Sequence, residues 1–189
     1  MDIENIAMSK PKVKVFAGPN GSGKSTLTEE MLIYGAYVNA DDIQAHRGCN
    51  NLEAAQETEA LREYFLAHHM DFTFETVLST DRNILFLKRA KEVRYFIESV
   101  FVLTNNPEVN VKRVQSRVAE GGHDVPIDKI HSRYKKSLDR LKTLAKMSDE
   151  CEVYDNTDIP YVIYRKDADG EEIMPNKYWS KDQIIKLLY

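Results

Sequence analysis

Short apolar segments alternate with longer segments of helical spacing over most of this chain. The short segments have the length and the β-branched or aromatic content of strands, and lie at residues 13–18, 37–40, 71–76 and 97–104. Apolar residues recur every three or four positions in the segments between them, at residues 24–33, at residues 53–69 and after Asp81, a candidate helix cap. Strands that alternate with helices in this way predict a mostly parallel sheet with helices on both faces.

The alternation changes in the last third of the chain. Residues 151–155 form a further candidate strand, and residues 161–165 precede a turn at 167–170, which predicts a C-terminal hairpin. Ser180 opens a short final helix. The chain shows no internal repeat and no low-complexity linker, so we expect a single domain over residues 1–189.

The composition is that of a globular protein. Hydrophobic residues make up 42% and charged residues 30% of the 189 positions. No apolar run approaches the roughly 20 residues that cross a bilayer, and the first residues lack the pattern of a secretory signal. We therefore expect a cytoplasmic protein without a membrane partner, in which Cys49 and Cys151 are reduced thiols.

Charge is unevenly placed along the chain. The net charge of −4 argues against general affinity for nucleic acids. Between residues 112 and 146, however, ten lysines and arginines stand against four acidic residues. A polyanionic ligand would find complementary charge in this segment.

Residues 18–25, GPNGSGKS, match the phosphate-loop pattern G-x-x-x-x-G-K-[ST] at every fixed position, between a candidate strand and a candidate helix. Glycines let backbone N–H groups approach phosphate oxygens, and the N-terminal end of the helix favours the same anions. Lys24 is expected to reach the β- and γ-phosphates of ATP, and the Ser25 hydroxyl to ligate Mg²⁺. We assign nucleotide binding to Gly18, Pro19, Asn20, Gly21, Ser22, Gly23, Lys24, Ser25 and Thr26.

Acidic residues follow two candidate strands, and strand ends line the ligand crevice of an open α/β sheet. Asp41 is a candidate base for an attacking hydroxyl and Asp42 a candidate substrate contact; alternatively, both simply start a helix. Glu75, with Thr76 beside it, would hold Mg²⁺ through water or bind hydroxyls of the acceptor, or else face solvent. The strand that ends at residue 104 carries no terminal acid, which favours small kinases over switch or motor ATPases.

A glycine pair interrupts the basic segment. Arg113 and Arg117 are four residues apart and therefore share one face of a helix that begins at residue 107. Gly121 and Gly122 end this helix, and Pro126 suits the first turn of the next one. Residues 107–146 thus predict a hinged helical lid.

The arginines of this lid are candidates for contact with the transferring phosphate. Arginine holds phosphate bidentately and keeps its charge, so Arg117 and Arg133 are assigned catalytic roles and Arg113 a nucleotide contact. His123, beside the hinge, is assigned to the substrate. The alternative is a solvated basic face on an exposed helix pair. Lys129, Arg133, Lys136 and Arg140 form a basic stripe along the second of these helices.

Together these motifs resemble the zeta toxin family of P-loop kinases, particularly its compact single-domain members. The resemblance is carried by GPNGSGKST at residues 18–26, NADDI at 39–43, FET at 74–76 and the arginine segment before Pro126. It implies a nucleotide-kinase-like fold with Lys24 on phosphate, Asp41 as base, Glu75 on the acceptor and Arg117 in the lid. The family's second lid arginine precedes a proline where this chain has HDVP at 123–126, so Arg113 or Arg133 is a candidate substitute.

The resemblance also implies cofactors, an acceptor and a partner. Zeta toxins use ATP and Mg²⁺ to phosphorylate a sugar hydroxyl of UDP-N-acetylglucosamine, and a small antitoxin blocks their ATP site. The expected function is therefore an ATP-dependent kinase with an alcohol acceptor, for which the resemblance suggests this nucleotide sugar or a relative. Three alternatives stay open: a metabolite kinase unrelated to toxicity, a nucleotide-binding regulator or weak ATPase without an acceptor, and a nucleic-acid kinase, which the acidic net charge disfavours.

Overall fold

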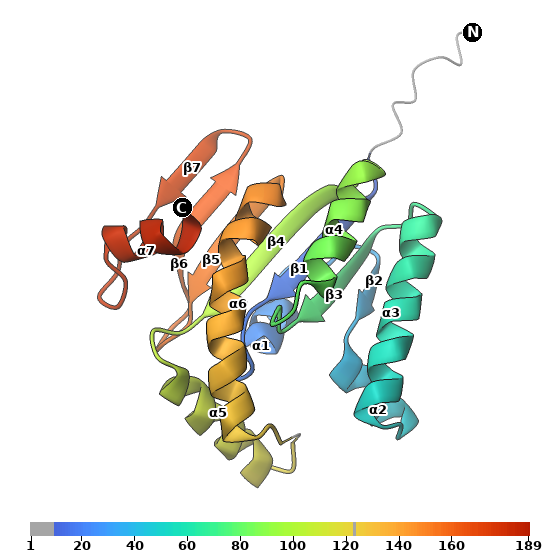
Figure 1. The fold of residues 1–189 in the computed structure, drawn as a ribbon, viewed down its shortest axis with the longest axis horizontal. Helices are drawn as coiled ribbons and strands as arrows, with labels where there is room; N and C mark the ends of the chain where they lie inside the picture. The colour runs from blue at the N-terminus through green and yellow to red at the C-terminus, as the bar shows by residue number, and fades with distance from the viewer. Residues whose placement is uncertain (1–9, 123) are drawn as a thin grey trace, which may run out of the picture.

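A seven-stranded sheet forms the centre of the molecule in the computed structural model, which describes residues 10–122 and 124–189. Its strand order is β2-β3-β1-β4-β5-β6-β7 (Figure 1). The strands are β1 (Lys12–Ala17), β2 (Ala36–Val38), β3 (Phe72–Thr76), β4 (Phe96–Leu103), β5 (Glu150–Asp155), β6 (Tyr161–Asp167) and β7 (Gly170–Ile173). The first five run parallel and the last two antiparallel, which confirms the predicted parallel sheet and the C-terminal hairpin.

Seven helices connect or flank these strands in the described part of the chain. They are α1 (Lys24–Glu30), α2 (Ala40–Arg47), α3 (Asn51–Ala67), α4 (Arg82–Glu92), α5 (Pro107–Ala119), α6 (Ile127–Met147) and α7 (Lys181–Leu188). Proline begins α5, and Ser180 caps α7 by accepting the backbone N–H of Gln183, both as the sequence indicates. No helix in residues 10–122 or 124–189 combines the length and apolarity needed to span a bilayer.

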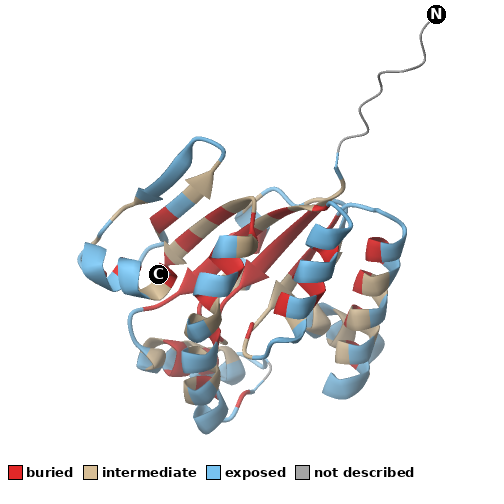
Figure 2. Ribbon diagram, turned by 45° about the horizontal axis from the view of Figure 1, so that its top comes forward, coloured by how far each residue is buried: buried red, intermediate tan, exposed pale blue. Residues whose placement is uncertain are grey.

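Helices cover the two faces of the sheet unevenly. Helices α3, α4, α6 and α7 contribute to one large apolar cluster with β1, β3 and β4, around Phe72, Phe74 and Leu87. On the other face α1 provides the apolar cover, because Leu27 packs there against Phe16 and Val102. The strands at the centre are buried while the outer sides of the helices are exposed (Figure 2). The prediction of helices on both faces is confirmed, with most of the core on one side.

Three local details differ from the sequence prediction. The helix expected over residues 24–33 ends at Glu30. The strand expected at residues 37–40 ends at Val38, because the Asn39 side chain accepts the backbone N–H of Asp41 and starts α2. Asp81, the expected cap of α4, makes no capping hydrogen bond. Its carboxylate instead accepts from Nε of Arg140 at 2.9 Å, so this arginine of the basic stripe joins α6 to α4.

The two cysteines differ in environment. Cys151 lies in β5 and is buried, and that burial raises the pKa of its thiol to about 11. Cys49 is half-buried. Because the thiolate is the nucleophile, we expect a chromogenic disulfide reagent at mildly alkaline pH to modify Cys49 in the native protein and Cys151 only after denaturant is added. Simultaneous modification of both thiols in the native protein would contradict the buried environment of Cys151.

Candidate active site

The phosphate loop joins β1 to α1 and has the backbone shape that its glycines permit. Gly21 and Gly23 have φ angles of +75° and +91°, which favour glycine. A Cβ at Gly23 would also lie 2.2 Å from Nδ2 of Asn156, and one at Gly21 would lie 2.5 Å from the carbonyl oxygen of Asn110. Both the conformation and the close packing therefore require glycine at these two positions.

Two buried asparagines hold this loop in place. Nδ2 of Asn110, in α5, donates to the carbonyl oxygen of Asn20 at 2.7 Å, and Nδ2 of Asn156, after β5, donates to the carbonyl oxygen of Ser22 at 2.8 Å. Sequence reasoning missed both residues, because neither belongs to a motif. A buried amide needs a partner, but the sequence shows neither the burial nor the partner, since both arise only when distant segments meet.

The predicted site residues converge on one cleft of about 450 Å³. Eleven of them line it: Asn20, Gly21, Gly23, Lys24, Ser25, Thr26, Asp41, Glu75, Thr76, Arg113 and Arg117. Five predicted residues do not line this cleft: Gly18, Pro19, Ser22, Asp42 and Arg133. The remaining one, His123, lies outside the described residues.

Lys24 is the buried cation of the cleft. Its Nζ donates to the carbonyl oxygen of Pro19 at 3.1 Å. Burial lowers the pKa of Lys24 from its ordinary value, whereas the carboxylates of Glu75 and Asp41 oppose this shift. A charged amine in such a site gains strongly from an added anion, because burial removes the water that otherwise solvates the charge.

Glu75 accepts three hydrogen bonds at the end of β3. Ser25 Oγ donates to it at 3.2 Å, Thr28 Oγ1 at 2.9 Å and the Tyr37 hydroxyl at 2.6 Å. Burial, followed by the charge of Glu75, raises the pKa of Tyr37, so the phenol stays a neutral donor. These contacts rule out the alternative of a solvent-facing side chain and place the carboxylate beside the hydroxyl of Ser25.

Asp41 and Asp42 lie in the first turn of α2, which agrees with the alternative that they start a helix. The residue that caps this helix is Asn39. Asp41 also lines the cleft, whereas Asp42 does not. Burial and then the charges of Glu75 and Asp41 raise the pKa of Asp42. A helix start and a site residue are therefore compatible descriptions of Asp41.

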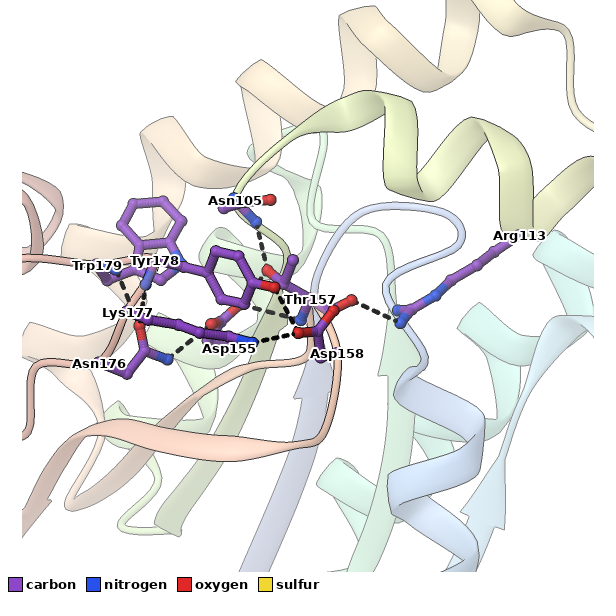
Figure 3. Close-up of polar contacts among 9 residues, drawn as sticks. All are labelled: Asn105, Arg113, Asp155, Thr157, Asp158, Asn176, Lys177, Tyr178 and Trp179. Carbon is purple, nitrogen blue, oxygen red and sulfur yellow. Dashed lines mark hydrogen bonds and ion pairs between the residues drawn. The ribbon is translucent and has the colours of Figure 1, made fainter.

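The three lid arginines approach the phosphate loop from different directions. Arg117 lines the cleft. Nη2 of Arg113 donates to the carbonyl oxygen of Thr157 at 3.2 Å, which directs this side chain to the loop after β5 (Figure 3). Nη1 of Arg133 donates to Oδ1 of Asn20 at 3.2 Å and so links α6 to the phosphate loop. The alternative of a purely solvated basic face is wrong for these residues.

The loop after β5 is fixed by residues that follow the hairpin. The Asp155 carboxylate accepts from Asn176 at 2.7 Å, and the Asp158 carboxylate accepts from Lys177 at 2.6 Å and from the hydroxyl of Tyr178 (Figure 3). This loop carries Asn156, which holds the phosphate loop. Residues 176–178 thus hold the loop that carries Asn156 and, through this asparagine, support the phosphate loop.

A second hollow of about 570 Å³ adjoins the cleft and shares Ala40, Glu75, Thr76 and Val77 with it. Three arginines line this hollow: Arg62, Arg82 and Arg133. We call it the acceptor-side hollow, because the residues expected to contact an acceptor, Glu75 and Thr76, lie between it and the cleft. The guanidinium carbon of Arg62 lies 4.9 Å from the centre of the Phe74 ring, and its Nη1 donates to Oδ1 of Asn83 at 2.7 Å. Sequence reasoning missed Arg62, which looks like any charged residue of an amphipathic helix until its burial among apolar residues is known.

The residues of the cleft fit a magnesium ion bound together with a nucleotide. Magnesium in such sites keeps several waters and takes only one or two protein ligands in addition to phosphate oxygens. Ser25 and the adjacent Glu75 supply hydroxyl and carboxylate oxygens of this kind. No group of three or more His, Cys, Asp and Glu side chains within residues 10–122 and 124–189 forms a metal site by itself.

Comparison with known proteins defines the fold. No protein-family model matches the chain. In sequence it is similar to an uncharacterized protein of Haemophilus influenzae, with 27% identity over 129 residues, 65% of this chain and 92% of the relative. In structure it is similar to a chain of the PezAT chromosomal toxin–antitoxin system of Streptococcus pneumoniae, with TM-score 0.58, 15% identity and coverage of 95% of this chain and 84% of that one.

A second structural neighbour was solved with ATP. It is the complex AvrRxo1-ORF1:AvrRxo1-ORF2, which matches with TM-score 0.64 and 13% identity over 87% of this chain and 60% of that one. PezT is a zeta toxin and AvrRxo1 a zeta-toxin-like kinase. These likenesses confirm, at the level of the fold, the resemblance indicated by the motifs. The chain has the fold of the zeta-toxin-like P-loop kinases.

Proposed function

We propose that this protein is an ATP-dependent kinase that moves the γ-phosphate to a hydroxyl of a small metabolite. The observation that carries the proposal is the convergence of Lys24, Asp41, Glu75 and Arg117 on one cleft beside the phosphate loop. Phosphoryl transfer depends mainly on positioning and on compensation of charge. The cleft provides cations for the phosphates and a carboxylate for the attacking hydroxyl.

Each residue has a distinct role in this proposal. Lys24 binds the β- and γ-phosphates, which replace the carbonyl of Pro19 as its partner. Asp41 accepts the proton of the acceptor hydroxyl as the hydroxyl oxygen attacks the γ-phosphorus atom. The bond between this phosphorus and the oxygen that bridges it to the β-phosphate breaks, and ADP leaves with that oxygen. Arg117 stabilises the negative charge on the transferring group. Ser25 and Glu75 would hold Mg²⁺, which supplies further positive charge to the phosphates when bound.

The acceptor side of the site favours an anionic substrate. The acceptor-side hollow joins the cleft at Glu75 and Thr76, and its arginines suit a phosphate or carboxylate group. This combination supports a nucleotide sugar, and the resemblance to zeta toxins suggests UDP-N-acetylglucosamine or a relative. A metabolite kinase unrelated to toxicity is the second candidate. A regulator or weak ATPase would need neither this adjoining hollow nor Asp41 in the cleft.

Transfer of label tests the proposal. The protein is incubated with γ-labelled ATP and Mg²⁺, first with UDP-N-acetylglucosamine and then with a pool of phosphorylated metabolites. We expect the label to appear in a small molecule other than ATP, covalently bound and distinct from inorganic phosphate. Label released only as inorganic phosphate, at the same rate with and without acceptors, would contradict a kinase and favour the weak ATPase.

Replacement of Arg117 by alanine is expected to lower turnover by about 10²–10³-fold, because a cation that stabilises charge in the transition state is lost. The KM for ATP should change far less, since Lys24 and the loop backbone still bind the phosphates. Steady-state kinetics at varied ATP concentration measure both. Lys112→Ala, on the exposed side of the same helix, serves as the matched control. Equal losses in turnover and ATP affinity would identify Arg117 as a simple binding residue.

A small antitoxin that covers the ATP cleft stays a prediction for this chain. It rests on the resemblance and on a structural neighbour from a toxin–antitoxin system.

A further inference from the structure

A separate pocket lies between α6, α7 and the segment that precedes α7. It has a volume of about 500 Å³, within the range of small-molecule sites. Its lining shares no residue with the nucleotide cleft or the acceptor-side hollow. Tyr134, Leu138 and Lys142 recur every four residues along α6 and form one wall, whereas Arg133 and Arg140 of the same helix face other partners. We call this space the α6–α7 pocket.

The floor of the α6–α7 pocket is apolar. Leu138, Leu187 and the ring of Trp179 line it. Trp179 is only 8% exposed, and its indole Nε1 has no hydrogen-bond partner among the described residues. That nitrogen is itself buried, so Trp179 presents its ring rather than its N–H group to the pocket.

The rim of the pocket is positively charged. Lys135, Lys142 and Lys186 line it together with a single acid, Asp139. None of the three lysines forms an ion pair in the described part of the chain, although Nζ of Lys142 donates to the backbone oxygen of Tyr189. Lys135 and Lys186 thus have no ion-pair partner in the described part of the chain, whereas Lys142 is held by Tyr189. An apolar floor beneath this cationic rim complements a ligand with an apolar body and a negatively charged head.

From these contacts we infer that the α6–α7 pocket binds a small organic anion, with an aromatic or aliphatic body on Leu138, Leu187 and Trp179 and an acidic head at the lysine rim. The volume of about 500 Å³ is that of a small-molecule site. The site is independent of the proposed kinase activity, because none of its residues lines the nucleotide cleft. Either can therefore fail without the other.

The test uses fluorescence, because Trp179 is the single tryptophan of the chain. The probe is 8-anilinonaphthalene-1-sulfonate, which accepts energy from tryptophan, and it is added to the full chain with excess ATP and Mg²⁺ present. We expect saturable quenching of Trp179 by the probe, weakened in about 0.5 M salt. N-phenyl-1-naphthylamine, which has the same apolar body without the sulfonate, should bind more weakly. Weaker probe binding with ATP than in a parallel titration without it would overturn the inference. Absence of saturable quenching, or equal affinity of the neutral probe, would also overturn it.

Variants locate the site. Lys135→Gln combined with Lys186→Gln is expected to weaken binding of the sulfonate probe by about tenfold, since two favourable charges are lost. Binding of the neutral probe should stay constant, which controls for folding. Lys181→Gln, exposed on α7 outside the pocket, is the matched control and should leave both affinities unchanged. An unchanged affinity for the sulfonate probe in the double variant would overturn the inference. A competition experiment compares octanoate, a small organic anion, with a short acidic peptide. Displacement of the probe by the peptide at lower concentration than by octanoate would also overturn it.

Discussion

Replacement of Lys24 by methionine is expected to lower the rate of phosphoryl transfer by about 10²–10³-fold, because the positive charge that the phosphate-loop lysine places at the β- and γ-phosphates is lost. Methionine keeps most of the aliphatic length and removes the amine. The structure gives the reason for so large an effect: the amine is buried in the cleft and donates to the carbonyl of Pro19. Label transfer from γ-labelled ATP measures the rate.

The same variant separates binding from stability. Without ATP, Lys24→Met should melt at a temperature no lower than that of the parent, since a desolvated charge is removed. With ATP and Mg²⁺ the parent should be stabilised by mass action, while the variant should gain much less. Lys88→Met, exposed on α4, is the matched control and should behave as the parent. An equal ATP-dependent rise in the parent and in Lys24→Met would show that Lys24 does not bind the phosphates.

Replacement of Asp41 by asparagine is expected to lower phosphoryl transfer by about 10²–10⁴-fold, the usual contribution of a general base. Asparagine preserves the size of the side chain, and α2 still starts at Asn39, because Asn39 bonds the backbone N–H at position 41. The affinity for ATP should therefore change little. Single-turnover label transfer and ATP-dependent thermal stabilisation measure the two quantities separately.

Asp42→Asn provides the comparison on the same helical turn. Asp42 does not line the cleft, so its replacement should reduce transfer far less than that of Asp41. If Asp42→Asn removes activity and Asp41→Asn retains it, the assignment of the base is reversed. If both variants retain transfer, neither carboxylate is the base.

Features that depend on neighbouring residues were predictable from the sequence. The phosphate loop is one, because its spacing fixes the backbone of a few adjacent residues, and the sheet built from short apolar runs is another. The boundary between β2 and α2 was not, because Val38 continues an apolar run and only the cap at Asn39 ends it. Asp41 was nevertheless expected at this edge of the sheet, and it lines the cleft, since a strand end and a helix start meet there.

Features that depend on contacts between distant segments were not predictable. The asparagines that hold the phosphate loop, Asn110 and Asn156, lie 90 and 134 residues from their partners. Arg62 reaches the acceptor-side hollow only because α3 packs beside β3 and α4. Such residues carry no local pattern, and their burial is a property of the whole fold.

The sequence by itself therefore determined the phosphate loop, the alternation of strands and helices, the hairpin and the candidate carboxylates and arginines. Those features follow from local backbone preference and from the period of apolar residues. Only the tertiary structure decided that Glu75 lies against Ser25, that Asp41 rather than Asp42 lines the cleft, and that Arg133 meets Asn20. The physical reason is that side-chain contacts across a parallel sheet depend on strand order and helix packing, which no short stretch of sequence encodes.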